Sequence, residues 1–118
     1  MIPAGVQVFV ALEPVDMRYG FERLSGLIRE RVGYEARCGA LFAFIGKRRT
    51  TMKILFFDGS GLCLFSKRLD RGTFAFPDPP TEGATHVEVD DATLDTLLDG
   101  IEITPTSKPQ RRAPRRVH

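Results

Sequence analysis

Three short apolar segments separated by turn-forming residues occupy the middle of the chain, between residues 41 and 76. Residues 41–45 and 62–65 are apolar throughout, and residues 52–57 are apolar except for Lys53. The sequence GKRRTT separates the first two segments, and DGSG separates the second from the third. Apolar, aromatic-rich runs of this length bounded by glycine, aspartate and serine are typical of β-hairpins. We therefore expect an antiparallel meander as the core of the fold, with a basic turn at one end and an acidic, glycine-rich turn at the other.

The N-terminal part of the chain predicts one strand followed by one long helix. Alternation of valines with other residues over 6–12 predicts a strand that is buried on one face. Asp16 is expected to cap a helix over residues 18–32, and Gly33 is expected to end it in the left-handed conformation. The apolar stripe of this helix consists of Met17, Phe21, Leu24, Leu27, Ile28 and Val32. Such a stripe has to pack on the meander, because no other large apolar surface is present.

Arg18 would then lie in the first turn of that helix, where the helix dipole disfavours a positive charge. We therefore expect a nearby carboxylate partner for this side chain, such as Asp58 or Asp70.

The C-terminal part predicts smaller elements. Residues 76–83 read as a rigid connector and residues 86–89 as a short strand. A short helix carrying Leu94, Leu97 and Leu98 follows; it is capped by Asp90, Asp91 or Thr93 and ends at Gly100. Residues 101–103 are expected to add an edge strand, and residues 104–118, rich in proline and arginine, to be disordered. The expected fold is thus one α+β domain over residues 1–103, with a basic tail.

Length and cysteine content narrow the class of protein. A chain of 118 residues has the size of one domain. Cys38 and Cys63 lack the close spacing of zinc ligands, and no cofactor motif or metal site is expected. The start of the chain does not resemble a signal peptide, and no apolar run approaches the roughly 20 residues that span a bilayer. We expect a cytoplasmic protein.

Charge is distributed in three blocks. Residues 1–77 carry an excess of five positive charges, residues 78–102 carry eight acidic residues and no base, and residues 103–118 carry five bases and no acid. Folding does not need this alternation, so it indicates a charged partner.

The basic residues near the turns and in the tail are the candidate nucleic-acid contacts, since arginine and lysine pair with phosphate oxygens. These candidates are Lys47, Arg48, Arg49, Lys53, Lys67, Arg68, Arg71, Arg111, Arg112, Arg115 and Arg116. The alternative is that the cations of the hairpin form a solvated tip. The phenylalanines of the same strands, Phe42, Phe44, Phe57 and Phe65, are interpreted as core rather than as a base-stacking surface.

The sequence gives little support for a catalytic site. Asp16, Asp58 and Asp70 would be the acidic trio of a metal-dependent nuclease, but a helix cap at Asp16 and turn positions at the other two explain them more simply. His86 and His118 have no serine or cysteine partner that would indicate nucleophilic catalysis. No catalytic residue is assigned.

Several blocks of the sequence resemble a known family. They are PVDMRYGF at 14–21, LFAF at 41–44, KILFFD at 53–58 and SKRLDRGTF at 66–74. The chain is similar, over roughly residues 6–103, to the TnpB-type accessory proteins encoded by the second open reading frame of the IS-sixty-six group of bacterial insertion sequences. The residues that carry the family motif are Asp16, Met17, Arg18, Gly20, Phe21, Asp58 and Gly72. The resemblance implies a protein that assists transposition beside a larger transposase and has no active site of its own.

Three functions remain open. The first is a non-catalytic accessory factor for DNA transposition that contacts the ends of the insertion sequence through the basic hairpin and the tail. The second is an adaptor that docks on the transposase through the acidic segment 78–102. The third is a small metal-dependent nuclease.

Overall fold

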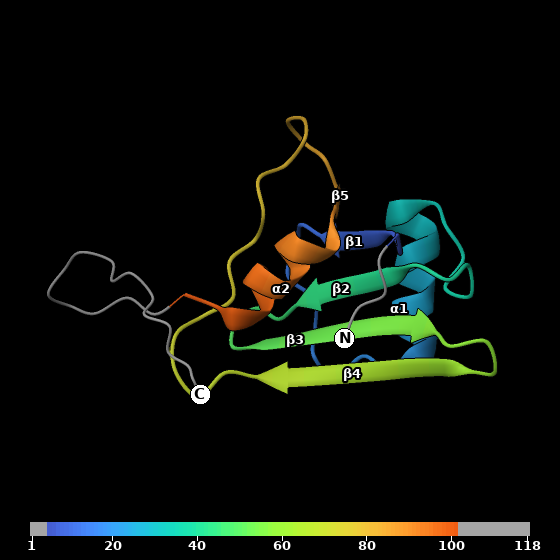
Figure 1. Ribbon diagram of the computed structural model, residues 1–118, viewed down its shortest axis with the longest axis horizontal. Coiled ribbons are helices and arrows are strands. Elements are labelled where there is room, and N and C mark those ends of the chain that lie inside the picture. Colours follow the sequence, from blue (N-terminus) through green and yellow to red (C-terminus); the bar gives the residue numbers. More distant parts are fainter. Residues whose placement is uncertain (1–4, 102–118) are drawn as a thin grey trace, which may run out of the picture.

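The computed structural model describes residues 5–101, which form one five-stranded sheet with helices on both faces (Figure 1). The strands are β1 (Val8–Ala11), β2 (Leu41–Ile45), β3 (Thr51–Phe57), β4 (Leu62–Arg68) and β5 (His86–Val89), and their order across the sheet is β4-β3-β2-β1-β5. The helical elements are α1 (Phe21–Leu27), the π-helical turn η1 (Ile28–Val32) and α2 (Asp91–Asp99). The α+β class is confirmed.

The predicted meander is present as β2, β3 and β4, paired antiparallel in continuous registers. β1 lies beside β2 and runs parallel to it, and β5 pairs antiparallel with the other edge of β1. A parallel pair needs a crossover connection, and α1 with η1 supplies it. The sheet is therefore mainly antiparallel with one parallel pair.

β1 is shorter and more deeply buried than the sequence predicts. The alternation over residues 6–12 predicted one buried face, but all four residues of β1 are buried. Phe9 and Ala11 pack in the cluster under α1 and η1, whereas Val8 and Val10 pack in the cluster under α2. The prediction of a half-buried strand is wrong because β1 lies in the interior of a sheet that is covered on both sides.

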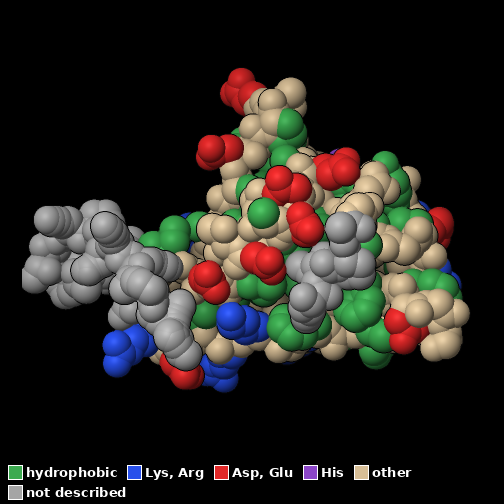
Figure 2. All heavy atoms as spheres, in the orientation of Figure 1, with side chains coloured by type: hydrophobic (Ala, Val, Ile, Leu, Met, Phe, Trp, Pro, Cys, Tyr) green, Lys and Arg blue, Asp and Glu red, His purple; other side chains and the backbone are tan. Residues whose placement is uncertain are grey.

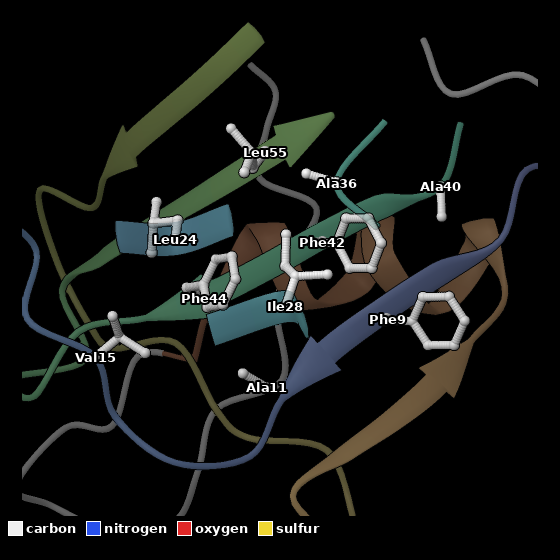
Figure 3. Packing of buried hydrophobic residues seen from close by; sticks show 10 residues of the cluster. All are labelled: Phe9, Ala11, Val15, Leu24, Ile28, Ala36, Ala40, Phe42, Phe44 and Leu55. Atoms are coloured by element: carbon white, nitrogen blue, oxygen red, sulfur yellow. The ribbon is translucent and has the colours of Figure 1, made fainter. Parts of the chain in front are cut away.

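The first cluster joins the crossover to the sheet. Leu24 of α1 and Ile28 of η1 lie against Phe42 and Phe44 of β2, with Leu55 of β3 beside them (Figure 3). Phe42 and Phe44 are 1% exposed, which confirms them as core. Phe65 differs from them, because 40% of its surface is exposed.

The helix starts later than predicted. Its first residue is Phe21 rather than Arg18, and the residue before it, Gly20, has no side chain with which to cap it. Phe21 is 45% exposed, and Met17 precedes the helix, so neither belongs to a helical core stripe as expected. The end is as predicted, since Gly33 has φ 82° and its N–H donates to Ile28 O at 2.9 Å.

The second cluster lies on the opposite face, where α2 covers the sheet. Asp90 caps α2 by accepting a hydrogen bond from Thr93 N–H at 2.8 Å, which confirms a predicted cap. Leu94 of α2 and Phe74 of the segment after β4 are both fully buried in this cluster. Of the predicted strand 101–103 only Ile101 is described, and it forms an isolated bridge with Thr73. The boundary after residue 103 and the basic tail lie outside the described residues and stay predictions.

Candidate nucleic-acid interface

The basic turn between β2 and β3 is tightly closed. Gly46 N–H donates to Thr51 O at 3.0 Å, and Arg49 N–H donates to Gly46 O at 2.9 Å. Arg49 closes the turn with φ 62°, in the left-handed region that favours glycine, and it is the one non-glycine residue among those described with a positive φ. The side chains of Lys47, Arg48 and Arg49 are all exposed. A tight turn thus presents three adjacent cations to solvent.

The segment after β4 holds this turn in place. Phe74 N–H donates to Arg49 O at 2.6 Å, and the Arg49 guanidinium lies over the Phe76 ring at 5.6 Å from its centroid. A guanidinium at this distance from an aromatic face is attracted by the ring. The conformation of Arg49, which is rare outside glycine, is therefore fixed by contacts far along the chain.

The loop before α1 lies against the same turn. Val15 N–H donates to Ile45 O at 3.0 Å, and Val15 forms a parallel bridge with Gly46. Met17 packs so closely on Gly46 that a Cβ at that position would lie 2.6 Å from Met17 Cγ. Glycine at position 46 thus lets the loop approach the hairpin.

Within this loop, Asp16 and Arg18 form a bidentate pair. The guanidinium of Arg18 donates to Asp16 at 2.7 Å and 3.0 Å, and its backbone N–H donates at 2.9 Å. The side-chain hydrogen bonds from Arg18, followed by the backbone one, hold the pKa of Asp16 well below its usual range, and Asp16 in turn raises the pKa of Arg18. The predicted helix cap at Asp16 is wrong, because its carboxylate closes a local turn before the helix. The predicted carboxylate partner of Arg18 is confirmed, but the residue is Asp16, and the two examples named, Asp58 and Asp70, are wrong.

A shallow groove of about 560 Å³ separates this loop from the basic turn. Its walls carry Arg18 from the loop, Lys47, Arg48 and Arg49 from the turn, and Arg68 from the end of β4. Arg68 reaches the groove because it is paired with Thr51 across the β3–β4 ladder. Asp16, already paired with Arg18, is the one acidic residue in the lining. The fold therefore gathers five cations from three separate stretches of the chain around one groove.

Two of the predicted contacts have other partners. Lys53 Nζ donates to Tyr19 O at 3.1 Å, which ties the loop before α1 to β3. Lys67 Nζ donates to Leu98 O at 2.8 Å, near the C-terminal end of α2, where a cation also complements the helix dipole. Both lysines support the fold around the groove and lie outside its lining.

The remaining predicted contacts lie elsewhere. Arg71 is exposed in the turn after β4 and does not line the groove. The tail arginines, Arg111, Arg112, Arg115 and Arg116, lie outside the described residues. Sequence reasoning missed Arg18 as a groove residue and Phe76 as the ring under Arg49, because both are distant in sequence from the turn that they approach.

The conformation of Arg49 leads to a stability prediction. Arg49→Gly should be more stable than Arg49→Ala by about 1 kcal/mol, since both lose the cation but only glycine adopts this φ without strain. Urea unfolding of the two variants measures the difference. At Arg48, which has no positive φ, the same pair of substitutions should show alanine as the more stable. The same order at both positions would contradict the geometry.

Asp58 closes the turn between β3 and β4. Its carboxylate accepts hydrogen bonds from Ser60 N–H at 2.8 Å and Gly61 N–H at 3.0 Å. These two backbone hydrogen bonds, with one from the Ser60 hydroxyl, lower the pKa of Asp58 to about 2. Gly72, another residue of the resemblance, has φ 76° in the next turn. Within residues 5–101, no group of three histidine, cysteine or acidic residues is arranged to hold a metal ion.

The lowered pKa of Asp58 predicts a pH dependence of stability. The ionised form favours folding, so its contribution is complete above the ordinary pKa of 3.8 and is lost as pH falls through about 2. Asp58→Asn cannot titrate, and the stability advantage of the natural chain over this variant should shrink between pH 4 and pH 2. Urea unfolding at several pH values measures it; a difference that stays constant with pH would contradict the assignment.

Comparison with known sequences identifies the family. The sequence profile described as IS66 Orf2 like protein matches residues 6–108, which include the whole groove. The chain belongs to this family. Two similar proteins come from Sinorhizobium fredii (strain NBRC 101917 / NGR234). One, "Uncharacterized protein y4hO", is 39% identical over 104 residues, which are 86% of this chain and 88% of the relative. The other, "Uncharacterized protein y4jC", is 33% identical over 113 residues, which are 96% of this chain and 94% of the relative.

No solved structure matches the chain. Membership of the IS66 Orf2-like family confirms the resemblance and indicates an accessory role associated with transposition, in a family of accessory proteins rather than of known enzymes. None of the helices within residues 5–101 is both long and apolar enough to cross a membrane.

Proposed function

We propose that this IS66 Orf2-like protein assists transposition by binding the DNA backbone in the groove between residues 15–18 and the basic turn. The observation that carries this proposal is the convergence of Arg18, Lys47, Arg48, Arg49 and Arg68 on one groove. Five cations and one acidic residue make the groove strongly positive, whereas the rest of residues 5–101 is rich in acidic residues. DNA phosphates are the partner such a surface fits.

The geometry suits phosphates better than bases. The groove is shallow and its cations belong to a short turn and a loop end, whereas reading base edges in a DNA groove requires a helix or ribbon that inserts. Phe42 and Phe44, which would stack on bases, are buried in the core. We infer backbone contact with little sequence preference, to which the tail arginines would add.

The test is a titration of the full chain with duplex DNA at several salt concentrations. Phosphate contacts release counterions, and each contributes about −0.9 to the slope of log affinity against log salt. A slope close to zero, or no measurable binding at low salt, would reject DNA binding through the groove.

A second candidate function is docking on the transposase. Figure 2 shows acidic side chains gathered on the face that α2 covers, and within residues 78–101 no base interrupts them. Glu88 lies on β5, and Asp91, Asp95 and Asp99 lie on α2. This acidic surface is separate from the basic groove, so one protein could use both.

The two candidates predict different variants to fail. Replacing Asp91, Asp95 and Asp99 by asparagine removes charge from the acidic surface and leaves Asp90, the helix cap, in place. If docking is the main function, this triple variant should lose the transposase in a pull-down while DNA binding is retained or strengthened. If DNA binding is the main function, replacing Lys47, Arg48 and Arg49 by alanine should prevent the protein from supporting transposition, whereas the asparagine variant should still support it.

A further inference from the structure

The outer edge of β4 is open. β4 ends the strand order, and within residues 5–101 no segment pairs with its far side. In Figure 1 it forms the lower edge of the sheet. An open edge presents unpaired backbone N–H and C=O groups to any strand that can reach it.

The hydrogen-bond pattern shows which residues present those groups. At one end of the β3–β4 ladder Asp58 N–H donates to Gly61 O, and at the other end Leu69 N–H donates to Thr50 O. Antiparallel ladders alternate between bonded and non-bonded pairs, so the backbone N–H and C=O of Phe65 point towards β3. The backbone N–H and C=O groups that point outward, away from β3, belong to Leu62, Leu64, Ser66 and Arg68.

Only the last residues of this strand carry charges of the kind that protect a sheet edge. Proteins usually protect such edges with short strands, proline, bulges or charged side chains, lysine above all. β4 has Lys67 and Arg68 at its end, but it has no proline, pairs with β3 in a continuous register of seven residues, and carries no charge from Leu62 to Ser66. Phe65 is 40% exposed on the α2 face, since it is paired with Ile54 of the cluster under α2. The edge is thus continuous over seven residues, and it is apolar from Leu62 to Phe65.

We propose that β4 pairs with β4 of a second copy of this chain, antiparallel, across a two-fold axis at Phe65. Phe65 is the midpoint of the seven-residue strand. In this register Leu64 of one copy faces Ser66 of the other, and Leu62 faces Arg68, so each outward residue meets an outward residue. Phe65 then faces its own counterpart in a non-hydrogen-bonded pair, where aromatic side chains stabilise a sheet.

The charges of the strand favour this orientation and this occupant. Both cations, Lys67 and Arg68, lie at the same end of β4. Parallel pairing would place each beside its own copy, whereas antiparallel pairing separates the two Arg68 residues by six positions, about 20 Å along the strands. A two-fold dimer also matches length and hydrogen-bond spacing on both sides without any further requirement.

The dimer would be a continuous ten-stranded sheet with two basic grooves. Arg68 and Thr51 share the face of α1, because Thr51 is two residues from Lys53 and its bond to Tyr19. Both grooves would therefore open on the same side, at opposite ends of the joined strands. Binding of one DNA molecule by both grooves would rest on the proposed function. The dimer itself does not depend on that function.

The first test is sedimentation equilibrium of the full chain without nucleic acid, over a wide range of concentration. The natural chain should dimerise reversibly. Phe65→Lys places two like charges across the axis and should weaken dimerisation tenfold or more. Tyr34→Lys is the matched control, since Tyr34 is 38% exposed and its ring centroid lies 4.7 Å from that of Phe9 on β1, three strands from this edge, and it should dimerise as the natural chain does.

A second test needs no disruptive change. In a chain carrying Cys38→Ser and Cys63→Ser, Phe65→Cys should form an intermolecular disulfide on mild oxidation, because Cα atoms of a non-hydrogen-bonded pair are about 4.5 Å apart. Tyr34→Cys in the same background should not, because Tyr34 lies against β1, three strands from β4. A monomer at every concentration, equal dimerisation of both lysine variants, or no disulfide at position 65 would overturn the proposal. Since DNA is absent, these outcomes are independent of DNA binding.

Discussion

Replacing Lys47, Arg48 and Arg49 together by alanine is expected to flatten the salt dependence of DNA affinity by up to about 3 units of slope. These residues supply three of the five cations in the groove lining. Each phosphate contact that is lost removes about 0.9 from the slope, so the effect on affinity is largest at low salt. Fluorescence anisotropy with a labelled duplex at four or five salt concentrations measures the slope directly.

The control removes the same amount of charge from another surface. Arg23, Arg29 and Arg37 are exposed, and all three lie outside the groove lining. Their replacement by alanine lowers the net charge equally and should leave the slope nearly unchanged. If both triple variants flatten it alike, DNA responds to net charge rather than to the groove, and the proposed interface is rejected.

Phe74→Ala is expected to destabilise the protein by about 3–5 kcal/mol, the range for removing a buried phenylalanine. Phe74 is fully buried with Leu94 of α2 and with Val8 and Val10 of β1, although it lies outside the five strands. Alanine would leave a cavity between α2 and the sheet. The backbone N–H of residue 74, which alanine keeps, donates to Arg49 O, so any shift of this segment into the cavity should loosen the basic turn as well.

Urea unfolding of Phe74→Ala and of Phe21→Ala measures this effect against a matched control. Phe21 is 45% exposed, and its replacement should change the free energy of unfolding by no more than about 0.5 kcal/mol. Similar losses in the two variants would show that residues 73–76 do not close the core beneath α2.

Local patterns in the sequence were sufficient for several elements. β2, β3, β5 and α2 lie within one or two residues of the predicted ranges, because each is bounded by turn residues or a cap that acts over a few positions. β4 continues three residues beyond the predicted apolar segment 62–65. Asp58 and Asp90 are examples: each accepts backbone N–H groups two or three residues ahead. The left-handed Gly33 is another, since the end of a helix selects for glycine locally.

Tertiary structure decided the rest. No local sequence pattern indicates that β1 lies between β2 and β5, because these two neighbours come from distant parts of the chain. The helix begins at Phe21 because residues 15–19 are held across the hairpin by Val15, by Met17 against Gly46 and by the bond from Lys53 to Tyr19 O. In this segment a local preference for helix competes with contacts to distant parts of the chain. The periodicity of the sequence reports only the local preference.

The same division holds for the candidate interface. The sequence by itself determined a cluster of cations at the β2–β3 turn and the exposure of that turn. Only the fold separated those cations from Lys53 and Lys67, whose ammonium groups bind backbone carbonyls, and added Arg18 and Arg68 from either side. A groove is a property of surfaces brought together in space, so its lining follows from sheet register and loop packing, which the order of residues along the chain does not display.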